Sequence, residues 1–322
     1  GDTIMINGGQ AITIRGDGEK LITSDSGNVK LLVGSKDNGA GTLNLGDAGL
    51  TSGGSLDGTL SIADESTVTV RAGMFSISTM EGTSSSAITI GTAQNAGGLT
   101  VGKASLNGAN VFLDPAWKDG GNLVSDASIG VFESFANGAV DGRFAVGRNS
   151  LLVLGDKDSA WAQKAVQDAL DNADLTWGKD SVTAALAIKS SQKLSASGAL
   201  LVDGSLAAAP SVTENTATFA GQSLLVVNAA AADGEGALQG DGTSRLSVDG
   251  GAKLHIMDVK GSQEYTVTSG FVNDKIEGWQ GDDLIVSRLF NAAVNTDGGK
   301  FVVKTEAKRP DEFSQYAIPN TL

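Results

Sequence analysis

Short stretches in which apolar residues alternate with small or polar ones recur along nearly the whole chain, and Gly, Asp and Asn separate them. A period of two places successive side chains on opposite faces of a strand, one toward a core and one toward solvent. The copies are degenerate, yet they persist, and this favours a stacked, quasi-one-dimensional β fold over a compact globule. Clear examples are residues 41–46, 58–63, 87–91, 97–102, 198–204 and 244–250.

The composition agrees with a narrow β core. The 322 residues include 44 glycines but only 4 prolines. The turns therefore depend on Gly, Asn and Asp, which tolerate positive φ. Aromatic residues make up 5% of the chain, so aliphatic side chains must fill the interior one layer at a time.

The spacing of the expected strands selects among β architectures. In residues 1–113 the strand starts lie roughly 8 to 18 residues apart, which is too close for helical crossovers between parallel strands. Hairpin signals such as Asn7-Gly8 occur without regularity. We therefore expect an all-β chain that folds as a single-stranded, right-handed parallel β-helix, a solenoid with turns of roughly 20 residues and about 4.8 Å between neighbouring strands.

Charge and cysteine content restrict the partners. The formal net charge is −14, and no basic run offsets it, so we expect no nucleic-acid or anionic-lipid partner. No apolar run approaches the roughly 20 residues that span a bilayer as a helix. The chain has no cysteine, which suits a protein that crosses a membrane unfolded.

The middle of the chain carries the one convincing helical pattern, at residues 158–172. Asp158 or Ser159 is a suitable N-cap, and an apolar stripe follows at helical spacing. Its members are Trp161, Ala165, Val166, Ala169 and Leu170. Two interpretations stay open: an insertion packed on the flank of the coil, or a lid or partner-binding helix.

The last part of the chain is richer in large aromatic side chains. A solenoid needs a terminal unit that covers its last turn and protects the open strand edge. We expect residues 259–307 to form such a β cap and to fold first, because large side chains best offset the entropy of ordering the chain. The cap candidates are Tyr265, Phe271, Trp279, Phe290 and Phe301.

Glycine-punctuated rungs followed by an aromatic-rich end resemble the passenger region of bacterial autotransporters, the type V secretion proteins. In this resemblance residues 1–258 form the β-helical passenger body, and residues 259–307 match the autochaperone segment. Residues 308–322 would begin the linker to an outer-membrane β-barrel that lies beyond this sequence. The resemblance implies a virulence-associated protein at the cell surface, exported across the Gram-negative outer membrane, in a fragment that is not itself embedded in the membrane.

The sequence offers few residues for a catalytic nucleophile or a metal site. Ser26, in Asp25-Ser26-Gly27, lies in a turn like that of a serine nucleophile, but the only histidine is His255, in an expected strand. One histidine and no cysteine exclude a His- or Cys-based zinc site. Asp17 and Asp241, each between glycines, are expected to make turns rather than bind calcium.

Carboxylate pairs offer the remaining catalytic possibility. A glycosidase or lyase on a β-helix needs two carboxylates facing each other across a sugar. The candidate pairs are Asp156 with Asp158, Asp233 with Glu235, and Asp282 with Asp283. Adjacent Asp residues in a strand point to opposite faces, so no catalytic residue is assigned.

The leading hypothesis is a non-enzymatic passenger, without cofactor or metal, that acts as an adhesin or interaction stalk. Its partner would be a host or matrix glycan or protein, or a passenger on a sister cell. One alternative is a carbohydrate-active β-helix enzyme, a polysaccharide lyase or hydrolase. Another is a purely structural spacer.

Overall fold

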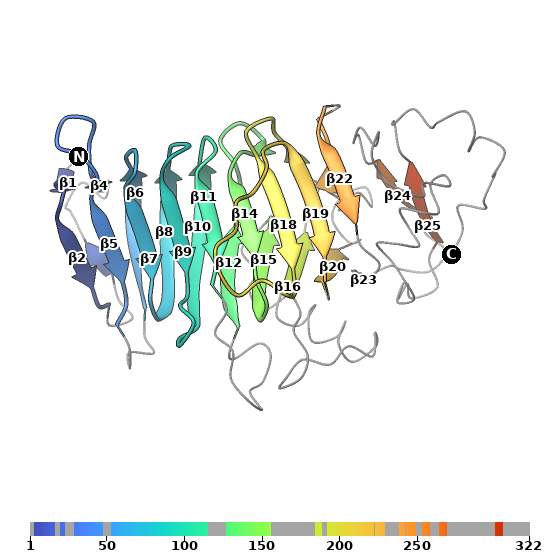
Figure 1. Ribbon diagram of the computed structural model, residues 1–322, viewed down its shortest axis with the longest axis horizontal. Coiled ribbons are helices and arrows are strands. Elements are labelled where there is room, and N and C mark those ends of the chain that lie inside the picture. The colour runs from blue at the N-terminus through green and yellow to red at the C-terminus, as the bar shows by residue number, and fades with distance from the viewer. Residues whose placement is uncertain are drawn as a thin grey trace.

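The architecture is seen in a computed structural model of the chain (Figure 1). The residues that the structure describes are 3–16, 20–22, 29–47, 53–114, 127–155, 184–188, 192–221, 223–228, 238–241, 243–248, 253–257, 264–268 and 300–304. The expected helix at 158–172 lies outside them, and so do residues 305–322. Within the described residues all regular elements are β-strands.

Two long parallel sheets dominate the fold, as the sequence predicts. The 11-stranded sheet, called sheet A, contains in spatial order β1 (Thr3–Ile6), β4 (Val29–Val33), β6 (Gly54–Ile62), β8 (Gly73–Glu81), β10 (Gly97–Ser105), β12 (Ser128–Phe132), β15 (Ser150–Leu154), β16 (Ala184–Ile188), β20 (Ser223–Asn228) and β23 (Lys253–Met257), with β3 (Lys20–Ile22) beside β6. The nine-stranded sheet B contains β2 (Ala11–Ile14), β5 (Thr42–Leu45), β7 (Thr67–Val70), β9 (Ala87–Ile90), β11 (Asn110–Leu113), β14 (Arg143–Val146), β18 (Ala199–Asp203), β19 (Thr216–Ala220) and β22 (Arg245–Val248).

The chain coils between the two sheets, so neighbouring strands belong to successive turns. The strands follow one another along the long axis of Figure 1. Thr67 lies opposite Ala87 in the ladder, an offset of 20 residues for one turn. Other turns are longer because loops extend from the coil. The fold is thus a parallel β-helix, and its short strands are held by parallel ladders on both sides.

The alternation read from the sequence explains the core. In β7 the valines at 68 and 70 are fully buried while the threonines at 67 and 69 face outward. Leu43, Val68 and Ile88 occupy the same inward position in β5, β7 and β9. Each turn therefore contributes one layer of aliphatic side chains, and burial of these layers drives folding.

The tight corner before sheet B also stacks from turn to turn. Thr67 N donates to Gly41 O at 3.0 Å, and Ala87 N donates to Ser66 O at 3.1 Å. The Ser66 hydroxyl also accepts a hydrogen bond from Gly41 N at 3.0 Å. Small residues are needed here because a Cβ at position 41 would lie 2.7 Å from the Gly34 backbone nitrogen. The corner satisfies its buried backbone groups without proline.

Near the middle of the described coil the alternation between the two sheets is interrupted. Counted along the two sheets, β15 and β18 are both seventh, and β16 and β19 are both eighth. The chain runs from β15 to β16 within sheet A, then back one level to β18, and then from β18 to β19 within sheet B. The first step falls between the end of β15 at Leu154 and the start of β16 at Ala184, and the second between the end of β18 at Asp203 and the start of β19 at Thr216. The first step adds a strand to sheet A alone, and the second adds a strand to sheet B alone. After both steps each sheet has gained one strand, so the later turns match across the two sheets again.

Two smaller sheets complete the described structure. β13 (Ala139–Val140), β17 (Gln192–Leu194) and β21 (Leu238–Gln239) form a three-stranded sheet. β24 (Glu264–Thr268) and β25 (Lys300–Lys304) pair in parallel within the expected cap, with Tyr265 opposite Phe301. The other cap candidates, Phe271, Trp279 and Phe290, lie outside the described residues, so the role of the cap stays a prediction.

Candidate functional surface

The outer side of β6, β8 and β10 presents a polar surface. Each of these strands spans nine residues. Three columns of outward side chains run across them in register, and seven of the nine carry a hydroxyl group. We call this surface the hydroxyl face; its residues are Ser55, Ser76 and Thr100, then Thr59, Thr79 and Lys103, then Ser61, Glu81 and Ser105.

The hydroxyl face is accessible to solvent, and its central strand is paired on both edges. Its side chains are exposed or half-buried. The inward neighbours Leu56, Ile77 and Val101 are buried in the aliphatic core. Because both edges of β8 are paired, the backbone under the face is fixed. Hydroxyl groups donate and accept hydrogen bonds, so such a face suits a polar partner that spans several strands.

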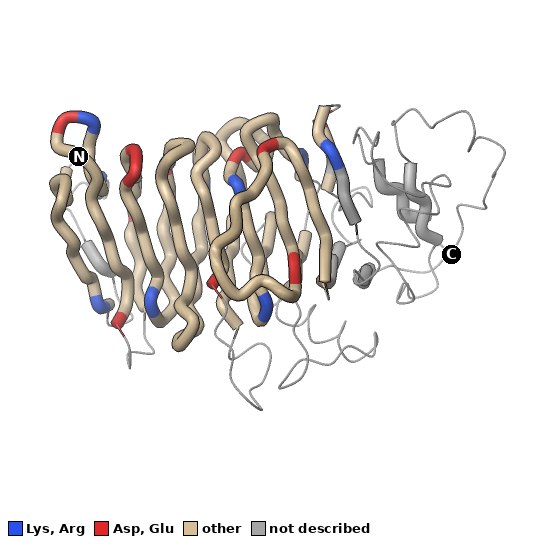
Figure 2. Tube along the Cα trace, viewed as in Figure 1, with Lys and Arg blue, Asp and Glu red and all other residues tan. Residues whose placement is uncertain are grey.

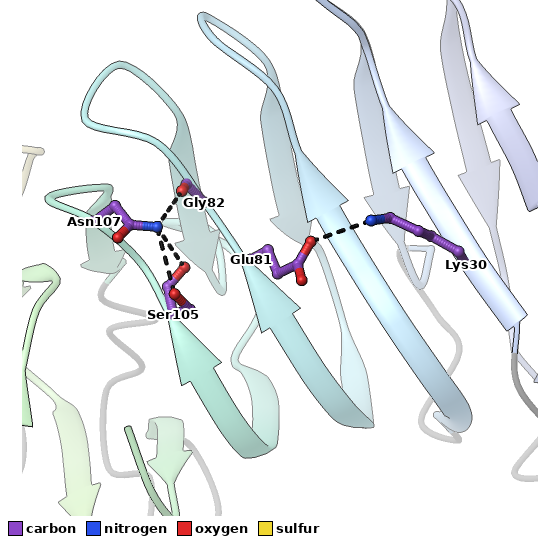
Figure 3. Close-up of polar contacts among 5 residues, drawn as sticks. All are labelled: Lys30, Glu81, Gly82, Ser105 and Asn107. Atoms are coloured by element: carbon purple, nitrogen blue, oxygen red, sulfur yellow. Dashed lines mark hydrogen bonds and ion pairs between the residues drawn. The ribbon is translucent and has the colours of Figure 1, made fainter. Parts of the chain in front are cut away.

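An ion pair crosses one edge of the hydroxyl face. Lys30 Nζ on β4 lies 3.4 Å from Glu81 Oε2 on β8, and the pair passes over β6 (Figure 3). Both side chains are nearly half exposed, so solvent screens the pair. The pair neutralises the Glu81 carboxylate and contributes little to the stability of the sheet.

Asn107 fixes the turn at the end of the same face. Its Nδ2 donates to Gly82 O at 3.1 Å and to Ser105 O at 3.3 Å (Figure 3). Its φ is 51°, a left-handed conformation that Asn tolerates better than most residues. The side chain thereby links the corner after β10 to the preceding turn.

A buried carboxylate supports that corner from the next turn. Asp141 is buried, and its two oxygens accept hydrogen bonds from Leu106 N at 3.1 and 3.2 Å, while Asn107 N donates to Oδ2 at 3.2 Å. Carboxylates that accept backbone N–H bonds in this way are structural. Asp141 is therefore assigned to the scaffold.

Further along sheet A the outer side becomes apolar. Ile129, Leu151 and Ala185 form one outward column across β12, β15 and β16, and Val131, Val153 and Ala187 form the next. All six are buried although they point away from the aliphatic core. These strands therefore read as continuous apolar runs, as strands buried on both sides do.

Charged residues are scattered and lie mostly near strand ends in the view of Figure 2. Asp114, at the corner after β11, is the described carboxyl with a strongly shifted pKa: burial raises its pKa from 3.8 to about 6. Its own backbone carbonyl accepts the Ser128 hydroxyl at 2.8 Å.

Of the candidate catalytic residues, the described structure includes only His255. Ser26 and the three carboxylate pairs lie outside the described residues. His255 falls in β23 of sheet A, as expected for a strand residue. Among described residues no group of three or more His, Cys, Asp and Glu is placed to hold a metal ion.

Asp241 makes a turn, in line with its position between two glycines. Its Oδ1 accepts hydrogen bonds from Thr243 N, Thr243 Oγ1 and Ser244 N, each at 2.8 Å. Burial raises its pKa, but the hydrogen bonds from Thr243 and Ser244 outweigh this and lower it below the usual value. Asp17 lies outside the described residues.

Sequence reasoning did not single out the hydroxyl face. The signal was available as Ser76 and Thr79 in one segment and as the alternating Thr59 and Ser61 in another. Only the register shows that these residues line up with Thr100, Lys103 and Ser105.

The architecture defines the class to which the chain belongs, the parallel β-helix solenoids. No protein-family model matches the chain, and no curated protein or solved structure matches it significantly. The described residues include no helix that is long and apolar enough to cross a membrane.

Proposed function

We propose that the protein is the passenger of a bacterial autotransporter and acts without catalysis, as an adhesin or interaction stalk at the cell surface. The observation that carries the proposal is the hydroxyl face on a β-helical stack. It offers a regular array of hydrogen-bonding groups, in which the charged side chains are Glu81 and Lys103, with the exposed Asp57 of β6 between the first two columns.

Binding would be spread over this array rather than concentrated at one residue. Each hydroxyl contributes a modest hydrogen bond in water, so a partner gains affinity by contacting several strands at once. A repeating polar surface, such as a matrix glycan or the side of another passenger, meets this requirement. The even spacing of the ladder, about 4.8 Å between strands, keeps the array regular.

The binding experiment compares two Thr→Arg variants of the purified chain on arrays of glycans and matrix proteins. Thr79→Arg places a bulky cation in the middle of the hydroxyl face. Thr69→Arg makes the same change on β7, in the outer face of sheet B. We expect Thr79→Arg to weaken binding at least tenfold and Thr69→Arg to leave it unchanged. Equal effects, or no binding by the parent chain, would contradict an adhesive role for this face.

Cell-surface display is tested separately in the source bacterium. Antibodies against the chain should label intact cells, and external protease should remove the signal. Labelling only after permeabilisation would overturn the passenger assignment. Cleavage of a polysaccharide by the purified chain would support the enzyme alternative instead.

A further inference from the structure

The outer side of β12, β15 and β16 is buried, although it lies away from the aliphatic core. None of its six apolar residues is more than 3% exposed, whereas the hydroxyl face of the same sheet is exposed or half-buried. A sheet that is apolar on both sides needs a covering layer on both sides. We call this surface the outer apolar face; its residues are Ile129, Val131, Leu151, Val153, Ala185 and Ala187.

The connection between β15 and β16 is in position to provide that layer. These strands are parallel neighbours in sheet A, and the chain leaves β15 at Leu154 and enters β16 at Ala184. A connection between parallel neighbours must return along one side of the sheet. The inner side is filled by core residues such as Leu152 and Leu186, so the outer side remains for the return.

The corresponding step in sheet B already follows such a path. The chain from β18 to β19 passes across β14 in the view of Figure 1. At one end of β14, Arg148 N donates to Leu206 O at 3.0 Å. At the other end, Arg143 Nη1 lies 3.3 Å from Glu214 Oε1, and the outward Ala145 between these contacts is 2% exposed. A connection that returns outside its sheet, opposite in hand to the turns of the coil, is therefore part of this fold.

We propose that residues 158–172 form an amphipathic helix that crosses from β15 to β16 and packs its apolar stripe on the outer apolar face. The stripe, from Trp161 to Leu170, has the spacing of a helix that is buried on one side. A helix over these residues would be about 22 Å long, and a five-residue strand such as β15 spans about 17 Å. The helix is thus long enough to return along the whole strand and to cover its neighbours.

The side chains of the face fit a helix that packs closely on β16. The outward residues of β16 are Ala185 and Ala187, whereas β12 and β15 present isoleucine, leucine and valine. Small side chains leave room for a large one above them, and Trp161 is the largest of the stripe. Residues 115–126 include a second tryptophan, Trp117, but they lead from sheet B to sheet A and need not return across a sheet.

The test uses single cysteines, because the chain has none of its own. In Ala187→Cys the thiol should react slowly with a maleimide, since position 187 is fully buried. Adding Trp161→Asp together with Leu170→Asp should raise the labelling rate at least tenfold, because a charged stripe no longer packs on the face. Gln167→Asp, on the opposite side of the helix, should leave the rate unchanged. An unchanged rate in the double aspartate variant would overturn the proposal.

Two controls separate loss of the covering helix from loss of the fold and from a different cover. Ala217→Cys places the thiol in the aliphatic core, and this thiol should stay protected in the double aspartate background. Trp117→Asp should leave the thiol of Ala187→Cys protected. A labelling rate that rises equally with Trp117→Asp would assign the cover to residues 115–126 and overturn the proposal.

Disulfide formation tests the contact directly and serves where the double aspartate variant does not fold. Ala169→Cys, in the stripe, should form a disulfide with Ala185→Cys or Ala187→Cys at least tenfold faster than Gln167→Cys does with the same partners. The bond requires Cα atoms about 4.4 to 6.8 Å apart, so it reports which side of the helix lies on the sheet. Equal rates for the two helix positions, or no disulfide with either, would overturn the proposal.

Discussion

Lys30 Nζ and Glu81 Oε2 lie 3.4 Å apart although their strands are two turns apart in the solenoid. The ladder places Thr59 between Lys30 and Thr79, so the side chains reach across a whole strand, about 10 Å at the usual spacing. Long, flexible side chains can do this only on a flat sheet whose intervening residues are small. Both side chains therefore extend along the surface over β6.

The contribution of this pair to stability should be small. A double-mutant cycle with Lys30→Met and Glu81→Gln is expected to give a coupling free energy below about 1 kcal/mol, because both side chains are half exposed. The coupling should vanish at high salt. Urea titration measures it; a coupling of several kcal/mol that survives high salt would show that the pair holds the sheet together.

Arg143 should matter much more, because its side chain joins three turns. Its Nε donates to Gly108 O at 2.7 Å, its Nη2 donates to Ser84 O at 2.6 Å, and its Nη1 lies 3.3 Å from Glu214 Oε1. Arg143→Met should lower the free energy of unfolding by about 2 to 3 kcal/mol, since it removes charge-assisted bonds to two carbonyl groups. Arg71→Met is the control, at an exposed position, and should cost less than about 0.5 kcal/mol. Equal losses of stability in the two variants, measured by urea titration, would show that the contacts of Arg143 do not hold the turns together.

Asp114 should make stability depend on pH in the direction opposite to that of most carboxylates. Its pKa of about 6 in the folded chain lies above the usual 3.8, so the folded state holds the proton more tightly. Its contribution to the free energy of unfolding therefore falls as pH rises from about 4 to about 6. Above about pH 6 the ionised carboxylate destabilises the folded state by the full amount. Asp114→Asn should stabilise the protein by of order 1 kcal/mol near pH 8, less than the full shift implies because the group is only half-buried.

The control for Asp114 is the same comparison in acid. Near pH 3 both states are protonated and Asp114→Asn should have almost no effect on the urea midpoint. A gain that is equal at both pH values would mean that the substitution acts through packing rather than through charge.

The two steps in the coil should be removable only together. Deleting residues 156–188 removes the first step together with β16. Deleting residues 204–220 removes the second step together with β19. Each single deletion shifts the later strands of one sheet by one level relative to the other sheet, so their inward faces lose their usual counterparts. The double deletion removes one strand from each sheet and restores the original match, one turn shorter. We expect it to unfold at a higher urea concentration than either single deletion, and a double deletion less stable than both would contradict the topology.

The cap can be tested by truncation, because its role is predicted from the sequence. Removal of residues 259–322 should slow refolding sharply or abolish it, since the turns cannot bury their apolar faces alone. Removal of residues 1–113 should leave a remainder that folds. Hydrogen exchange gives an independent measurement: the most protected amides should lie toward the C-terminal end, and fastest exchange in the cap would refute the idea.

Local patterns predicted the strands well because each depends on its own residues. The alternation in Thr67-Val68-Thr69-Val70 defines β7 with its inward valines, and Gly41 marks a corner where a Cβ does not fit. The same patterns could not give the hydroxyl face, because Ser55, Ser76 and Thr100 become neighbours only through the register of three turns.

The sequence by itself determined the class of fold, because a period of two with frequent glycine turns leaves few ways to bury alternate side chains other than stacking. The tertiary structure decided which residues of different turns become neighbours. It placed Lys30 near Glu81, joined three turns through Arg143, and buried Val153 on the outer side of its strand as well as Leu152 on the inner side. The physical reason is that strand formation is local, whereas ladder register and the coverage of an outer face depend on segments whose separation along the chain no short pattern records.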